Sequence, residues 1–176
     1  MLLQRNQQFA IKHSVHIHAT AECVWQHIID VDFASLRHPA YFALLDIPKP
    51  LNAEITQSGV GGARTAYFSN GHRFSQRITA WQPNERYAFT FHADPGFRAA
   101  YVLDLGAGSF QMKAGAYQIE PCTDGVRLSL SSDYELRGVI GACLHPPVRL
   151  VLALFQRHLL GGIKRNAELK SEAAYA

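Results

Sequence analysis

The chain has 176 residues, of which 48% are hydrophobic and 18% are charged, and its formal net charge is +3. This composition is typical of a soluble globular domain with a sizeable core, and it excludes an extended disordered chain. The basic residues form no dense run, so we expect no nucleic-acid partner.

The first predicted elements are one strand and two short helices. Residues 13–18 alternate between apolar and polar side chains, as in a strand with one buried face. Thr20 then precedes a segment in which apolar residues recur every four positions up to Asp30, which predicts a capped amphipathic helix. A second short helix is expected over residues 32–37, because Pro39 disfavours helical geometry in the residue before it.

The middle of the chain alternates with period two and is divided by turn signals, of which Asn70-Gly71 is the strongest for a hairpin. Strands are predicted at about residues 53–57, 63–69, 72–81, 86–92, 99–103, 109–119 and 126–136. The last strand alternates most cleanly, with Asp133 and Glu135 on the face opposite its apolar side chains. We expect a sheet that is covered on one face and wet on the other.

A long amphipathic helix is predicted at the C-terminal end, with Pro146-Pro147 in its first turn. Its longest apolar run, residues 150–155, is too short to span a membrane, so no integral membrane contact is expected. A curved antiparallel sheet that is covered by only one helix tends to enclose a space between the two. That predicted space is the best indication of function.

Three stretches resemble one known family. They are HIHATAECVWQHIIDVD (residues 16–32), GVGGAR (59–64) and RITAWQPNERYAF (77–89). Together they resemble the polyketide cyclase/START-like superfamily, which includes the Bet v 1 allergens. The resemblance implies an α+β helix-grip fold: a curved antiparallel sheet of about seven strands around a long C-terminal helix, with two short helices between the first two strands. The expected domain covers residues 13–174, after an N-terminal extension of residues 1–12.

The leading functional hypothesis is a binding protein that holds a hydrophobic small molecule, either a lipid or an aromatic metabolite. Seven residues on faces expected to turn inward are the candidate ligand contacts: Phe89, Phe91, Met112, Ser132, Tyr134, Phe155 and Leu159. Gln156 is a further polar group that could orient a ligand. A tyrosine hydroxyl needs a partner when it is buried, so Tyr134 either bonds to the protein or contacts the ligand.

Two other classes of function are compatible with the sequence. A cyclase or dehydratase would need a base such as His92 near the cavity, but the superfamily has no shared catalytic signature from which to carry over a residue. A protein-interaction module, or a homodimer, would use the apolar start of the last helix around Leu150 and Leu154. No cofactor is expected.

Other chemistry-bearing residues have simpler interpretations. His16 and His18 share one strand face but lack a third ligand, so they are interpreted as surface histidines and no metal site is expected. The three cysteines are widely spaced without a CxxC pair, and the N-terminus lacks a signal-peptide pattern, which together indicate a reducing, cytoplasmic location. The alternation does not assign Arg64, Arg77 or Trp81 to the inner or outer face, and a bulge is expected before Trp81.

Overall fold

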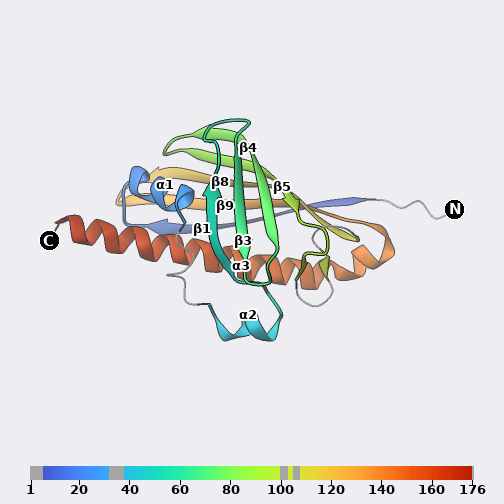
Figure 1. The fold of residues 1–176 in the computed structure, drawn as a ribbon. Helices are drawn as coiled ribbons and strands as arrows, with labels where there is room; N and C mark the ends of the chain where they lie inside the picture. Colours follow the sequence, from blue (N-terminus) through green and yellow to red (C-terminus); the bar gives the residue numbers. More distant parts are fainter. Residues whose placement is uncertain (1–5, 32–37, 100–102, 105–107, 176) are drawn as a thin grey trace.

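The computed structural model describes residues 6–31, 38–99, 103–104 and 108–175. Its elements, in chain order, are β1 (Gln7–Ile17), α1 (Ala21–Ile29), α2 (Ala40–Leu44), β2 (Pro50–Ile55), β3 (Ala63–Phe68), β4 (Arg73–Gln82), β5 (Arg86–Ala93), β6 (Arg98–Ala99), β7 (Leu103–Asp104), β8 (Phe110–Cys122), β9 (Gly125–Leu136) and α3 (Gly138–Tyr175). Seven strands form one antiparallel sheet in the order β1-β9-β8-β5-β4-β3-β2, and β6 pairs with β7 (Figure 1). This is the α+β helix-grip arrangement that the resemblance implies.

The first strand is longer than expected. β1 pairs with β9 from Gln7 to Ile17, so residues 7–12, expected to precede the domain, lie in the sheet. Thr20 caps α1 as predicted, because its hydroxyl accepts a hydrogen bond from the Cys23 amide at 3.2 Å. The helix expected over residues 32–37 lies outside the described residues. The structure has a short helix, α2, at Ala40–Leu44, where no helix was predicted.

The hairpin at Asn70-Gly71 joins β3 to β4 as predicted, and Gly71 has a φ of +81°, which suits glycine. The bulge expected before Trp81 is also present, since the register of β4 against β5 shifts between Ile78 and Ala80. The bulge places Trp81 against Trp25 of α1, with ring centroids 5.3 Å apart.

The outer face of the sheet is not uniformly wet. Asp133 is exposed, but Glu135 on the same face of β9 is only 5% exposed, which corrects the expected exposed position. Glu135 is covered because two neighbouring cations close over it: Arg137 Nε lies 2.7 Å and Lys113 Nζ 3.2 Å from its carboxylate oxygens. A carboxylate with two such partners tolerates burial.

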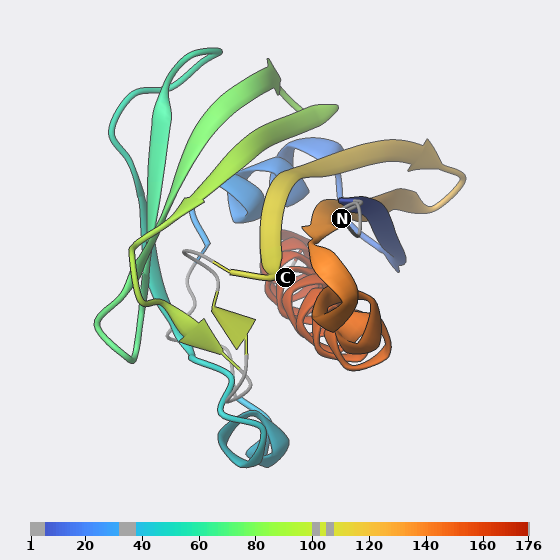
Figure 2. The same cartoon turned by 90° about the vertical axis from the view of Figure 1, so that its right-hand side faces the viewer.

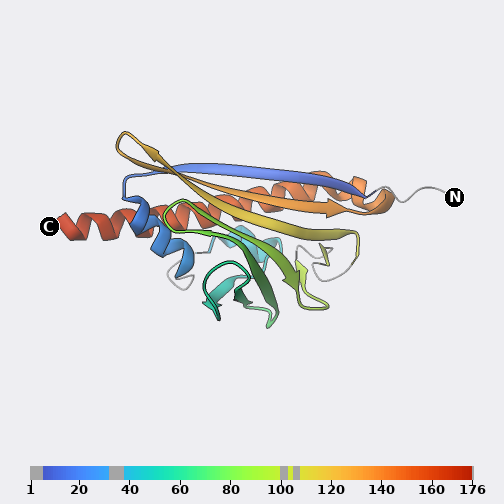
Figure 3. The same ribbon diagram turned by 90° about the horizontal axis from the view of Figure 1, so that it is seen from above.

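The C-terminal helix begins earlier than predicted. α3 starts at Gly138, so Pro146 and Pro147 lie within it and not in its first turn. Its backbone packs closely against β1 and β9 and against α1, whereas the other strands curve away from it (Figures 2 and 3). At the β1–β9 edge of the sheet, α3 therefore contacts the strands directly. Toward the other edge a gap separates the strands from α3, and side chains or a ligand must fill it. None of the helices in the described part of the chain is long and apolar enough to cross a membrane.

Candidate functional site

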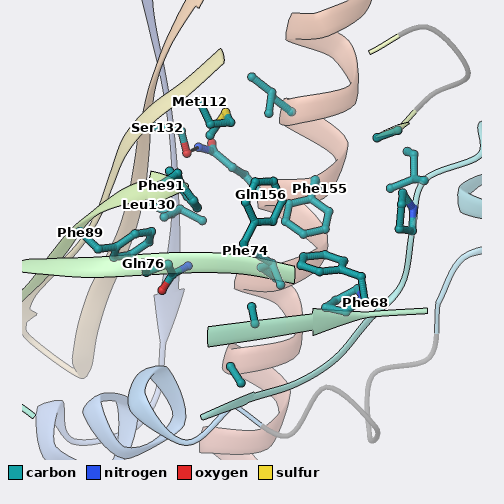
Figure 4. Close-up of a pocket in the computed structure, with 18 of the residues that line it drawn as sticks. Phe68, Phe74, Gln76, Phe89, Phe91, Met112, Leu130, Ser132, Phe155 and Gln156 are labelled. Carbon is teal, nitrogen blue, oxygen red and sulfur yellow. Dashed lines mark hydrogen bonds between the residues drawn. The ribbon is translucent and has the colours of Figure 1, made fainter. Parts of the chain in front are cut away.

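A cavity of about 150 Å³ lies between the sheet and α3 (Figure 4). Its wall is largely apolar and comes from six strands of the main sheet (β2, β3, β4, β5, β8 and β9), from α3 and from the segments near α2 and β6. The residues that line it include Ile47, Arg64, Phe68, Phe74, Gln76, Phe89, Phe91, Phe97, Met112, Tyr117, Leu130, Ser132, Phe155, Gln156 and Leu159.

Six of the seven candidate ligand contacts line this cavity, namely Phe89, Phe91, Met112, Ser132, Phe155 and Leu159. Tyr134 faces the same side of the sheet but lies further along β9. There it packs against Phe9 and Phe110, with centroid distances of 5.5 and 5.9 Å. Its hydroxyl is buried and has no hydrogen-bond partner among the described residues. Tyr134 is therefore not part of the cavity wall, although it packs directly against Phe110, which is.

An aromatic group on β3 and β4 completes the wall and was not singled out from the sequence. Phe74 packs against Phe68 at 5.4 Å, against Phe91 at 5.6 Å and against Phe97 at 4.7 Å between ring centroids. Phe68 shares a strand face with Arg64 and Ala66, and that alternation is the sequence signal that could have revealed it. These rings give the cavity a broad apolar surface (Figure 4).

At one end of the cavity the polar groups satisfy each other. Gln156 of α3 is 2% exposed and donates from Nε2 to the Ser132 hydroxyl at 2.9 Å and to the Ile11 carbonyl at 3.4 Å. Its Oε1 lies 2.8 Å from His13 Nδ1. Gln156 therefore ties α3 to β1 and β9, and it has little hydrogen-bonding capacity left for a ligand.

Elsewhere on the wall the polar groups are not satisfied. Arg64 of β3 is only 4% exposed, and its Nε has no hydrogen-bond partner among the described residues. Gln76 stands opposite it on β4, and the Gln76 Oε1 is likewise buried without a partner in the part of the chain described. Burial raises the pKa of Tyr117 to about 12, although the nearby Arg64 charge opposes this shift.

The remaining candidates lie outside the cavity wall. Arg77 and His92 are exposed on β4 and β5. Arg64 faces inward and Arg77 faces outward, which settles two of the positions that alternation left open. The predicted base His92 is therefore not positioned to act in the cavity.

The two surface histidines do have a third neighbour. His16 Nε2 lies 3.0 Å and His18 Nδ1 3.4 Å from the carboxylate oxygens of Asp124, and the three groups could hold a metal ion. Asp124 comes from the turn between β8 and β9, so spacing along the chain did not reveal it. Direct contact with the carboxylate already accounts for the position of both rings.

Residues 8–168 match the family described as polyketide cyclase/dehydrase and lipid transport. The chain belongs to this family. No curated protein sequence matches the chain. Among solved structures, Ara h 8.0201 is similar to this protein, with 14% sequence identity and a TM-score of 0.61. The match covers 92% of this chain and 98% of that chain.

Two further solved structures are similar to this protein. Protein CV1439 from Chromobacterium violaceum is 19% identical, over 90% of this chain and 96% of that chain, with a TM-score of 0.57. A norcoclaurine synthase point mutant from Thalictrum flavum, in complex with a transition-state analogue, is 15% identical, over 93% of this chain and 96% of that chain, with a TM-score of 0.56. At these identities the similarity establishes the Bet v 1-like fold alone.

Proposed function

We propose that this protein binds a hydrophobic small molecule, a lipid or an aromatic metabolite, in the cavity between the sheet and α3. The observation that carries the proposal is the aromatic wall, in which rings from β3, β4, β5 and α3 surround a space not filled by the protein's own side chains. Covering apolar surface contributes about 25 cal/mol per Å² before the cost of ordering a ligand. The lipid-transport part of the family description supports the same role.

A cyclase or dehydratase activity has weaker support. Acid–base catalysis at neutral pH is most effective with a group whose pKa lies near the working pH. Among the described residues of the wall, burial raises the pKa of Tyr117 to about 12, and Arg64 stays charged. These groups could stabilise a negative charge, but neither is suited to removing a proton. The binding role is therefore the proposal adopted.

Location and assembly belong to the same proposal. Cys23, Cys122 and Cys143 are free, which supports action in the reducing cytoplasm. Leu150 of α3 is 58% exposed, and it is the residue around which a homodimer or a protein contact would form. Light scattering of the purified chain, compared with Leu150→Glu, tests for a dimer. A monomeric mass for both proteins would remove this part of the proposal.

The direct test of binding uses N-phenyl-1-naphthylamine, a neutral dye that fluoresces in apolar surroundings. We expect saturable binding with one site per chain. Ala53, which lines the cavity from β2, is replaced by phenylalanine to fill the space, and Ala63→Phe adds the same bulk on the exposed face of β3 as the control.

The filled variant should bind the dye at least about tenfold more weakly, which corresponds to about 1.4 kcal/mol. The control should bind as the wild type does. Circular dichroism shows whether each variant is folded. Failure of the dye to bind the wild type, or equal binding by both variants, would remove the proposal.

A further inference from the structure

Arg64 is a buried cation that has no carboxylate partner among the residues that the structure describes. Two other arginines, by contrast, form ion pairs: Arg73 Nε lies 3.2 Å from an Asp94 carboxylate oxygen, and Arg137 Nε lies 2.7 Å from a Glu135 carboxylate oxygen. None of the ion pairs formed by the described residues includes Arg64, although it is the most buried of the three. An unpaired charge removed from water is strongly unfavourable unless a partner neutralises it.

The neighbours of Arg64 are polar but uncharged. Its guanidinium carbon lies 5.8 Å from the centre of the Tyr87 ring, which supplies a weak cation–π contact. Across the strand pair, Gln76 faces the same cavity with an unsatisfied amide oxygen. Tyr117 lines the cavity close enough for the Arg64 charge to affect its ionisation. A fork of guanidinium donors is thus placed beside two further hydrogen-bonding groups.

We infer that Arg64 binds the anionic head group of the ligand, and that the ligand is therefore an amphiphile with a carboxylate at one end of an apolar body. This inference rests on the proposed binding function. A carboxylate would accept two parallel hydrogen bonds from the guanidinium, and the Tyr117 hydroxyl is a further donor on the same wall. The apolar body would lie along Phe74, Phe91 and Phe155, which face the same space.

The position of Arg64 also determines the orientation of the ligand. Arg64 belongs to β3, on the side of the sheet that curves away from α3, whereas the satisfied Gln156–Ser132 pair bridges α3 and β9. The only unpaired cation on the described wall therefore lies on the β3 side. A carboxylate bound there is neutralised, and one bound at Gln156 is not.

The experiment measures displacement of N-phenyl-1-naphthylamine by dodecanoate and by dodecanol, which share a twelve-carbon chain and differ in the head group. For the wild type we expect dodecanoate to bind at least tenfold more tightly than dodecanol. Arg64→Met should weaken dodecanoate at least tenfold and change dodecanol less than twofold. Arg77→Met removes the same charge from the exposed face of the neighbouring strand and should change neither ligand.

Arg64→Lys is a second variant, which keeps the inference testable if Arg64→Met does not fold. It also distinguishes the effect of the positive charge from that of the guanidinium geometry. Lysine keeps the charge but loses the planar fork, so an intermediate preference for dodecanoate is expected. Equal affinities of the wild type for both ligands, unchanged in Arg64→Met, would overturn the inference while leaving the proposed function intact. If neither the dye nor either ligand binds the wild type, the proposed function fails and the inference fails with it.

Discussion

The outer face around Glu135 and the inner face around Arg64 treat a buried charge in opposite ways. Glu135 is 5% exposed and Arg64 is 4% exposed, so both have lost most of their contact with water. Glu135 contacts Arg137 and Lys113, whereas Arg64 contacts no carboxylate among the described residues. The comparison indicates that the first charge serves the structure and that the second is available to a ligand.

Gln156 is a third buried polar residue, uncharged and fully hydrogen-bonded, and replacing it should change the free energy of unfolding more than any other substitution proposed here. Replacing Gln156 by leucine keeps the size of the side chain but leaves Ser132 and the Ile11 carbonyl without their donor. We expect the free energy of unfolding to fall by about 2–3 kcal/mol, because unsatisfied buried groups are costly. Urea denaturation measures it, with the exposed Arg157→Ala on the same helix as the control. A loss no larger than that of the control would contradict the structural role of Gln156.

Glu135→Ala tests the satisfied charge directly. Its partners are partly exposed, with 40% and 47% of the Lys113 and Arg137 side chains accessible, so solvent screens the pairs. We expect a loss of about 1–2 kcal/mol at pH 7, against no measurable loss for the exposed Asp133→Ala. An equal effect of the two substitutions would show that burial of Glu135 has no energetic consequence.

The same pair gives a pH dependence with a definite sign. Hydrogen bonding from Arg137 holds the pKa of Glu135 below its ordinary value. The stabilisation is therefore complete above the ordinary pKa of about 4.3 and is lost as the pH falls through the lower folded value. The stability difference between the wild type and Glu135→Ala should persist at pH 6 and shrink below about pH 4. A difference that grows on acidification would contradict this pairing.

Arg64→Met should change stability in the opposite direction. Removing an unpaired buried charge, while filling its place with an apolar side chain, is expected to stabilise the ligand-free protein by about 1 kcal/mol. Thermal unfolding measures the change, and Arg77→Met should leave the transition unaltered. A clear destabilisation by Arg64→Met alone would show that Arg64 holds the fold together.

The half-buried residues His158 and His38 offer a further contrast with Arg64, because a histidine can lose its charge and an arginine cannot. Burial lowers the pKa of His158 first of all, with the His38 and Arg165 charges adding to the shift, and burial and Lys49 lower the pKa of His38. The unfolded chain then takes up protons before the folded one does, so stability should fall from about pH 6.5 downward. This is the smallest effect predicted.

His158→Gln should reduce that slope between pH 7 and pH 5, and the exposed His92→Gln should not. Thermal unfolding at a series of pH values gives the comparison. An identical slope in the wild type and in His158→Gln would show that His158 does not contribute to the pH dependence of stability.

Much of the fold could be predicted because alternation, caps and turns act locally. Asn70-Gly71 set the β3–β4 hairpin, and the alternation of β9 identified its inner face. α2 escaped notice because it is only five residues long and its N-cap, Pro39, makes no side-chain hydrogen bond. The start of α3 was misplaced because Pro146 and Pro147 are typical of a first turn but here lie inside the helix.

The cavity residues could be predicted only in part, because facing inward does not specify the position along a strand. Phe89 and Phe91 line the space, whereas Tyr134, two residues beyond Ser132, packs against Phe110 and Met112 and lies outside the wall that these two residues help to form. Arg64 and Glu135 were difficult for another reason. A charge on a strand indicates the wet face, and only the fold shows that one has partners and the other does not.

The pKa of a bound carboxyl head group shows whether Arg64 is the anion site of the cavity. Dodecanoate labelled with ¹³C at its carboxyl carbon is titrated by NMR while bound to the wild type and to Arg64→Met. Beside the Arg64 guanidinium, the pKa of the bound carboxyl should lie below that of the free acid, and in Arg64→Met it should lie above it, since burial alone favours the neutral form. The same pKa in both proteins, at or above that of the free acid, would contradict the claim that Arg64 is the anion site of this cavity.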